Sequence, residues 1–195
     1  TTSPVSPLTI KSNSVSSGES GLTIQANANT NTIIKLGERA NDGGRFEMLD
    51  AGVTKIALFT DGTDNYINAG KVGIGTTSPT AKLDIEGDLQ VKGVNISNQE
   101  NLDVDTGTET IATVVKANYD AAFFDFVIKN GTNLRAGTVF AIHDGTNVEF
   151  TETSTNDLGD TSDVTLSVDI SGTDMRLRAT TITDNWIIKS LVRTL

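Results

Sequence analysis

The chain has 195 residues, of which 36% are hydrophobic, no cysteine, and a net charge of −10. The absence of cysteine excludes disulfides as a source of stability, and no run approaches the roughly 20 apolar residues of a transmembrane helix. Nucleic-acid binding requires clustered cations, whereas residues 98–195 carry 7 Lys and Arg against 15 Asp and Glu, so we expect neither a nucleic-acid partner nor membrane insertion.

The first half of the chain shows short apolar stretches separated by turn signals. Because it starts with Thr1 rather than Met, we expect a fragment or a processed product. Strands are predicted at 8–13, 22–27, 32–36, 46–49, 54–59, 83–85 and 89–91. The first two stretches nearly repeat each other, and short repeated units usually stack to cover each other's apolar faces. A disordered low-complexity linker is the alternative.

A possible boundary follows these short strands. Ser97 and Glu100 have the spacing of a capping box and predict one short helical turn near residues 94–105. We therefore divide the chain into a stalk of repeated short strands, residues 1–97, and a head domain, residues 98–195.

The head sequence is dense in apolar residues and contains no proline, as hydrogen-bonded strands require. Strands are predicted near 110–116, 121–129, 134–143, 147–153, 163–170, 174–180 and 185–193. Seven strands joined by short turns are typical of a β-sandwich or jelly roll. The predicted fold is all-β, with an elongated stalk followed by a jelly-roll-like β-sandwich.

The clearest hairpin surrounds Gly172 and Thr173. Residues on both sides alternate between apolar and polar, and a two-residue loop beginning with Gly aligns them in one register. The predicted opposite pairs are Ile170 with Met175, Val168 with Leu177, Leu166 with Ala179 and Asp169 with Arg176. This register makes one face continuously apolar and pairs charges on the other.

A second hairpin turns at Asp144 and Gly145. A three-residue loop would place Phe140 opposite Phe150 and Ile142 opposite Val148, and we prefer it because it pairs apolar residues.

Some strands of the head are apolar on both faces. Phe124 and Phe126 share one face, whereas Phe123 and Val127 lie on the other. A two-layer sandwich buries one face of each sheet, so the second apolar face requires another partner. We expect a closed homo-oligomer.

Two sets of residues resemble known proteins. The segment Lys71-Val-Gly-Ile-Gly-Thr-Thr-Ser-Pro79, with the two strand sequences after it, resembles a segment of bacteriophage tail-fibre and tailspike proteins that also occurs in bacterial surface proteins. The second half is similar to a module of phage virion proteins. Its resembling stretches are 124–132, 142–146, 169–172, 176–180 and 189–195.

This resemblance implies a homotrimeric fibre on the outside of a virion. Three chains would wrap around a common axis in the stalk and carry three sandwich heads. The implied partners are further copies of the chain, other virion tail proteins, and a glycan or protein of the host-cell surface. Gly73 and Gly75 suit such a stalk because they permit close backbone approach or a positive φ.

Residue chemistry argues against catalysis. His143 is the sole histidine and adjoins a turn, and no nucleophile-elbow sequence is present. We therefore expect no enzyme activity and no cofactor. Two acidic segments leave a structural Ca²⁺ open as an alternative to solvated loops. Their potential ligands are Asp103, Asp105, Glu109, Asn156, Asp157, Asp160 and Asp163.

Receptor binding is expected on loops of the sandwich, because scaffolds commonly present functional residues on loops. The candidate residues are Asn130, Asn133, Asp144, Asn147, Asn156, Asp157, Asp184 and Asn185. Their side chains suit polar ligands, but they equally suit ordinary turns. The alternative functions are a non-adhesive virion spacer or capsid decoration protein, a glycan-degrading tailspike, and a bacterial surface adhesin.

Overall fold

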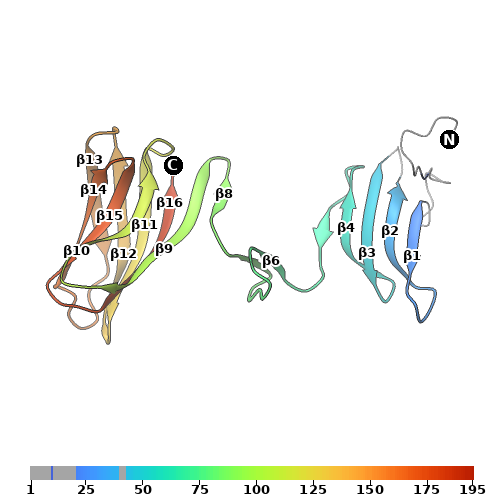
Figure 1. The fold of residues 1–195 in the computed structure, drawn as a ribbon, viewed down its shortest axis with the longest axis horizontal. Coiled ribbons are helices and arrows are strands. Elements are labelled where there is room, and N and C mark those ends of the chain that lie inside the picture. Colours follow the sequence, from blue (N-terminus) through green and yellow to red (C-terminus); the bar gives the residue numbers. More distant parts are fainter. Residues whose placement is uncertain (1–9, 11–20, 40–42) are drawn as a thin grey trace. The chain divides into compact units, whose positions relative to one another are not determined.

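The computed structural model describes residue 10, residues 21–39 and residues 43–195. These residues form strands and connecting loops without a helix, which confirms the predicted all-β class (Figure 1). Accordingly, this part of the chain offers no helix capable of spanning a membrane. The chain divides into an N-terminal unit, residues 1–72 and 80–82, and a C-terminal unit, residues 73–79 and 83–195.

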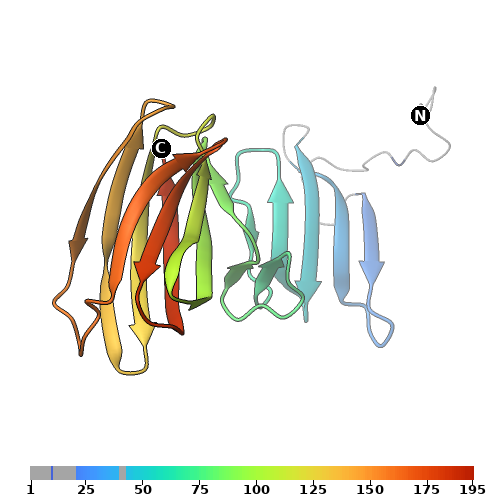
Figure 2. The same cartoon turned by 60° about the vertical axis from the view of Figure 1, so that its left-hand side comes forward.

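The N-terminal unit contains one antiparallel sheet in which neighbouring strands follow chain order (Figure 2). Its strands are β1 (Leu22–Gln25), β2 (Thr32–Glu38), β3 (Gly44–Asp50), β4 (Val53–Phe59) and β5 (Tyr66–Ile67). The prediction located the first four, whereas β5 was missed because it has only two residues. The strand predicted at 8–13 lies outside the described residues, apart from Ile10, which belongs to no strand.

The register of this sheet aligns apolar side chains in two rows across the strands. One row contains Leu22, Leu36, Phe46 and Leu58, and the other contains Ile24, Ile34, Met48, Ile56 and Ile67. Because side chains two residues apart share a face of a strand, the nine side chains lie on one face, here called the apolar ladder face. Six of them are exposed, from Met48 at 39% to Ile67 at 54%.

The glycine-rich segment that follows forms a small two-stranded sheet of β6 (Val72–Ile74) and β7 (Leu83–Ile85). A Cβ atom on Gly73 would lie 2.3 Å from the carbonyl oxygen of Thr76, and Gly75 has a φ of +80°. Both glycines therefore occupy positions that larger residues would strain, which confirms the expected close approach and positive φ.

The C-terminal unit is a sandwich of two antiparallel sheets (Figures 1 and 2). The six-stranded sheet has the order β13-β12-β11-β16-β9-β8, and the three-stranded sheet has the order β10-β15-β14. The strands are β8 (Leu89–Val91), β9 (Val94–Val104), β10 (Gly107–Val115), β11 (Ala121–Asn130), β12 (Asn133–His143), β13 (Val148–Ser154), β14 (Val164–Ser171), β15 (Asp174–Thr181) and β16 (Trp186–Thr194). The seven strands predicted between 110 and 193 are all present.

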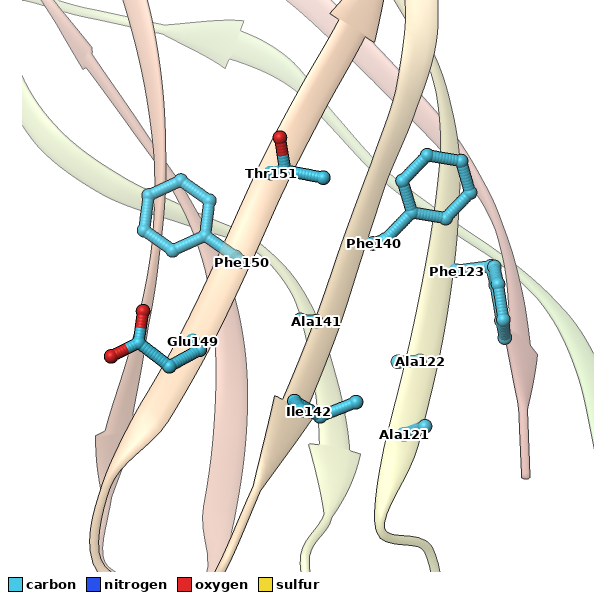
Figure 3. Close-up of a pocket in the computed structure, with 9 residues that line it drawn as sticks. All are labelled: Ala121, Ala122, Phe123, Phe140, Ala141, Ile142, Glu149, Phe150 and Thr151. Atoms are coloured by element: carbon cyan, nitrogen blue, oxygen red, sulfur yellow. The ribbon is translucent and has the colours of Figure 1, made fainter.

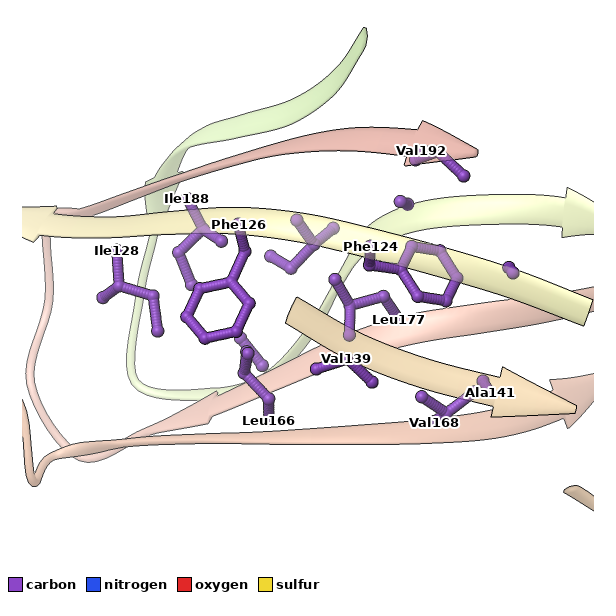
Figure 4. Packing of buried hydrophobic residues seen from close by; sticks show 14 of the residues in the cluster. Phe124, Phe126, Ile128, Val139, Ala141, Leu166, Val168, Leu177, Ile188 and Val192 are labelled. Carbon is purple, nitrogen blue, oxygen red and sulfur yellow. The ribbon is translucent and has the colours of Figure 1, made fainter. Parts of the chain in front are cut away.

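The core lies between the two sheets (Figure 4). Alternate residues of β11, including Phe124 and Phe126, point inward and pack with Leu166 and Leu177 from the opposite sheet. Ile111 and Ala112 are both buried although they are consecutive, because a bulge in β10 interrupts the two-residue alternation.

The helical turn predicted from Ser97 and Glu100 is wrong. Residues 94–104 form β9, which pairs with β16 from Ile96 to Val104. Pairing with a long neighbouring strand outweighs a local capping signal, since tertiary contacts override weak propensities. The boundary drawn between residues 97 and 98 consequently falls within a continuous strand.

The hairpin at Gly172 has the predicted register in all four pairs, from Leu166 opposite Ala179 to Ile170 opposite Met175. The register predicted for the hairpin at Asp144 is wrong by one residue. Phe150 lies opposite Ala141, and His143 opposite Val148, so the loop has four residues.

Candidate functional site

The sandwich separates the candidate receptor residues between its two ends. Six of them lie where β11 meets β12 and β16 begins: Asn130, Asn133, Asn156, Asp157, Asp184 and Asn185. Asp144 and Asn147 lie at the other end of β12, in the loop before β13. The candidates therefore do not form one site.

Side chains in the six-residue group hold their own loops together. The side-chain amide of Asn130 donates to the carbonyl oxygen of Asp184 at 3.1 Å. The carboxylate of Asp184 accepts from the hydroxyl and backbone N–H of Thr106 at 2.6 and 2.8 Å, and these bonds lower its pKa. The carboxylate of Asp157 similarly accepts hydrogen bonds from the backbone N–H and the hydroxyl of Thr161. These contacts give the loops a defined shape.

The Asp144 loop at the opposite end is held by a carboxylate and an imidazole. Asp144 accepts hydrogen bonds from the backbone and side chain of Asn147 and the backbone of Thr146, which lower its pKa to about 2. His143 Nδ1 lies 3.0 Å from Gly145 N and accepts from it, so Nε2 is the donor to Tyr119 O at 2.8 Å. Both imidazole nitrogens are thus occupied in positioning the loop.

The carboxylates of the two acidic segments likewise accept hydrogen bonds from other residues of the protein. Glu109 accepts from the side chain of Asn101 at 2.7 Å and from the backbone N–H of Asp105 at 3.0 Å. Asp163 accepts from the hydroxyl of Thr183. In the described part of the chain, no three His, Asp or Glu side chains group as ligands for a metal ion.

The outer face of the six-stranded sheet carries an aromatic pair. Phe123 and Phe140 pack edge to face, with ring centroids 5.5 Å apart, and the guanidinium of Arg193 lies 5.0 Å from the Phe123 centroid. Figure 3 shows these two rings together, with Phe150 on the neighbouring strand pointing away from them. Phe150 shares the inward face of Ala141, and it is 42% exposed.

A polar row adjoins the aromatic pair. Asp125 accepts from the hydroxyl of Thr138 at 2.6 Å and from Arg193 at 3.1 and 3.3 Å. Burial raises the pKa of Asp125, but these hydrogen bonds outweigh it and hold the pKa below the ordinary value. The sequence predicted the second apolar face of the strands. It contained no signal for this polar row, because the residues of the row lie on three different strands.

No family model matches the sequence, and no curated protein matches it. Among solved structures, the tailspike protein of Acinetobacter baumannii phage AM24 matches with a TM-score of 0.31 and 12% identical residues. This weak likeness covers 52% of the present chain and 26% of the tailspike, so the chain spans about a quarter of that protein's length.

Proposed function

We propose that the chain is a structural and receptor-binding part of a phage tail fibre that works as a homotrimer on the outside of the virion. Its partners would be two further copies, other tail proteins, and a glycan or protein of the host surface. The resemblance of residues 71–79 to tail-fibre segments supports this role. Attachment by three weak sites on one particle gains strength from effective concentration.

The observation that carries the proposal is the apolar ladder face. Its two rows contain nine apolar side chains and no charge, and they cross five strands spaced about 4.8 Å apart. Burying apolar surface stabilises an assembly by about 25 cal/mol per Å². Soluble monomers rarely leave such a patch open, and covering it with the same face of other copies requires no second protein.

Molar mass in solution tests the assembly. Light scattering of the purified chain should give three times the chain mass of 20.6 kDa. A compact single chain that melts cooperatively at high dilution would contradict the proposal, because the chain would then be stable with the apolar ladder face exposed to solvent.

Attachment requires a separate test. The labelled chain should bind a subset of strains in a panel of bacterial cells, and an excess of unlabelled chain should displace it. Failure to bind any strain, with the trimer intact, would contradict the adhesive role.

A non-adhesive virion spacer is the second candidate. It is favoured by one observation: the candidate loop carboxylates of Asp144, Asp157 and Asp184 are engaged in bonds within the protein. A trimer that binds neither cells nor glycans would support this function.

A further inference from the structure

The two sheets of the C-terminal unit differ in the chemistry of their outward faces. The outer face of the three-stranded sheet is polar, with side chains that include Thr108, Thr110, Thr165, Asp169, Arg176 and Arg178. The outer face of the six-stranded sheet, here called the outer sheet face, exposes large apolar side chains instead. Ile142 is 60% exposed, Leu191 44%, Val127 43% and Phe140 39%. The apolar surface of the two faces is thus concentrated on one of them.

These four side chains share the outer sheet face because of strand alternation. Phe126 and Ile128 of β11 are buried in the core, so Val127 between them points outward. Leu191 lies between the buried Ser190 and Val192 and points outward in the same way. The pairing of β11 with β12 and β16 places Phe140 and Ile142 on the same side of the sheet.

The charges of the outer sheet face are balanced within each chain. Arg193 Nε lies 3.1 Å from Asp125 Oδ2, and Lys189 Nζ lies 2.9 Å from Glu100 Oε2. The other charged side chains of this face in the regularly paired parts of the strands are those of Lys129 and Glu149, one of each sign. Because both ion pairs form inside one chain, burying them leaves no charge without a partner.

This balance favours a copy of the chain as the partner. Residues 98–195 carry 7 Lys and Arg against 15 Asp and Glu, so two copies repel each other over most of their surface. A neutral face can meet the same neutral face without that repulsion. A cationic partner would instead be drawn to the acidic loops at the ends of the sandwich.

The extent of the outer sheet face matches a standard protein interface. The six strands contain about 50 residues, which at a rise of about 3.4 Å and a strand spacing of about 4.8 Å cover about 800 Å². Specific, stable interfaces bury about 800 Å² on each partner. One copy of this face therefore offers the area that such a contact requires.

We propose that the outer sheet face is a contact between copies of this chain, in which the six-stranded sheets turn this face towards one another. The inference rests on the proposed homotrimer and adds a second interface to it, in the C-terminal unit. The contact is weak by itself because ion pairs interrupt its apolar area. It forms when the apolar ladder face holds the copies at a high effective concentration.

Hydroxyl-radical footprinting of the full chain tests the contact, because it reports the solvent exposure of individual side chains. Phe140, Ile142 and Leu191 should be oxidised at least about threefold more slowly in the wild-type trimer than in single chains of the Leu36→Lys/Met48→Lys variant, since the core of an interface excludes water. Ile182, which is 72% exposed in a loop of the same unit, is the internal control and should react equally in both. Equal oxidation of the outer sheet face in both samples would overturn the proposal.

A charge variant tests the same face without changing the ladder face. Ile142→Lys combined with Leu191→Lys should raise the concentration at which the trimer dissociates at least about tenfold, because the contact would bury unpaired ammonium groups. Sedimentation velocity over a dilution series measures this concentration. Thr113→Lys combined with Thr165→Lys adds the same charge to exposed positions of the other sheet and should match the wild type. Unchanged dissociation of the Ile142/Leu191 variant would overturn the proposal.

These results separate this inference from the proposed function. A trimer whose outer sheet face reacts as fast as that of single chains would overturn the inference and keep the homotrimer. A wild-type chain that is single in solution would overturn both. A protected face in a trimer that binds no cells would keep the contact and overturn the adhesive role.

Discussion

Gly137 shows how one residue can be required by packing rather than by a turn. It lies on β12 opposite Phe126 and Ser154. A Cβ atom built there would lie 2.3 Å from the carbonyl oxygen of Thr153 and 2.9 Å from the Phe126 ring. The missing side chain thus lets a core aromatic ring and a neighbouring strand approach the same point.

We predict that Gly137→Ala lowers the free energy of unfolding of the C-terminal unit by about 1–3 kcal/mol, the usual cost of overpacking. Urea denaturation measures the change. Gly44→Ala in the N-terminal unit is the control, because its Cβ would lie 3.5 Å from the Thr60 hydroxyl, an ordinary contact. Equal stability of Gly137→Ala and the wild type would contradict this packing.

Asp144 links a loop conformation to pH. Its pKa is lowered to about 2 by bonds that the unfolded chain lacks, where a carboxyl titrates near 3.9. The stabilisation is therefore fully present above about pH 4 and is lost as the pH falls through about 2. At neutral pH the loop remains closed.

NMR signals of the Thr146 and Asn147 amides should accordingly titrate with a midpoint near pH 2. Asp144→Asn should abolish this titration, since the amide does not ionise in this range. A midpoint near 3.9 in the wild type would show that the hydrogen bonds to Asp144 do not persist in solution.

At the scale of elements, the two hairpins show what sequence can predict. The hairpin at Gly172 was predictable because alternation on both strands and a Gly-first turn require the same register. The structure also adds Arg178 to the predicted Asp169–Arg176 pair, and Asp169 accepts from both guanidinium groups. Hydrogen bonding by Arg176, the largest contribution, lowers the pKa of Asp169.

The hairpin at Asp144 was not predictable by pairing of apolar residues alone. The carboxylate of Asp144 accepts from the N–H groups of Thr146 and Asn147 and thereby closes a four-residue loop. With this loop, Phe140 on the outer face lies opposite Thr151, and Phe150 falls on the inner face opposite Ala141. Local side-chain bonding outweighed the apparent benefit of an aromatic pair.

Gly172 has a φ of +59°, and a Cβ atom there would meet nothing within 4 Å, so its substitution has a purely conformational cost. We predict that Gly172→Ala lowers the free energy of unfolding by about 1–2 kcal/mol. Thr173→Ala, in the same loop but without a positive φ, should change it by less than about 0.5 kcal/mol. Urea denaturation of both variants checks this, and equal effects would contradict the turn geometry.

The strand β9 marks the limit of prediction from sequence. Ser97 and Gln99 are polar, yet both belong to a strand that pairs with β16 roughly 90 residues later. Such a pairing depends on how strands far apart in the sequence meet in the folded sheet, and the local sequence does not encode it.

For the whole molecule, the apolar ladder face determines what assembly should require. The short strands were predicted, but the rows depend on register across four strand pairs. The homotrimer remains a prediction, and charge placed on the ladder face tests it.

We predict that Leu36→Lys combined with Met48→Lys converts the assembly to single chains. Both side chains are exposed on the ladder face, so each ammonium would be hydrated in a single chain but buried without a partner in a trimer. Light scattering measures the mass. Thr23→Lys, on the opposite face of the sheet, should keep the wild-type mass, and an unchanged mass for the double variant would contradict the role of this face.

The strand order of the large sheet has a consequence for biosynthesis. β16 lies between β11 and β9, although it is the last of the six strands to leave the ribosome. At about 5–20 residues per second, the 55 residues between Asn130 and Trp186 take roughly 3–11 seconds to translate. Throughout this delay β9 and β11 both lack their shared neighbour, and nascent chains on one message could exchange β16 with each other before each completes its own sheet.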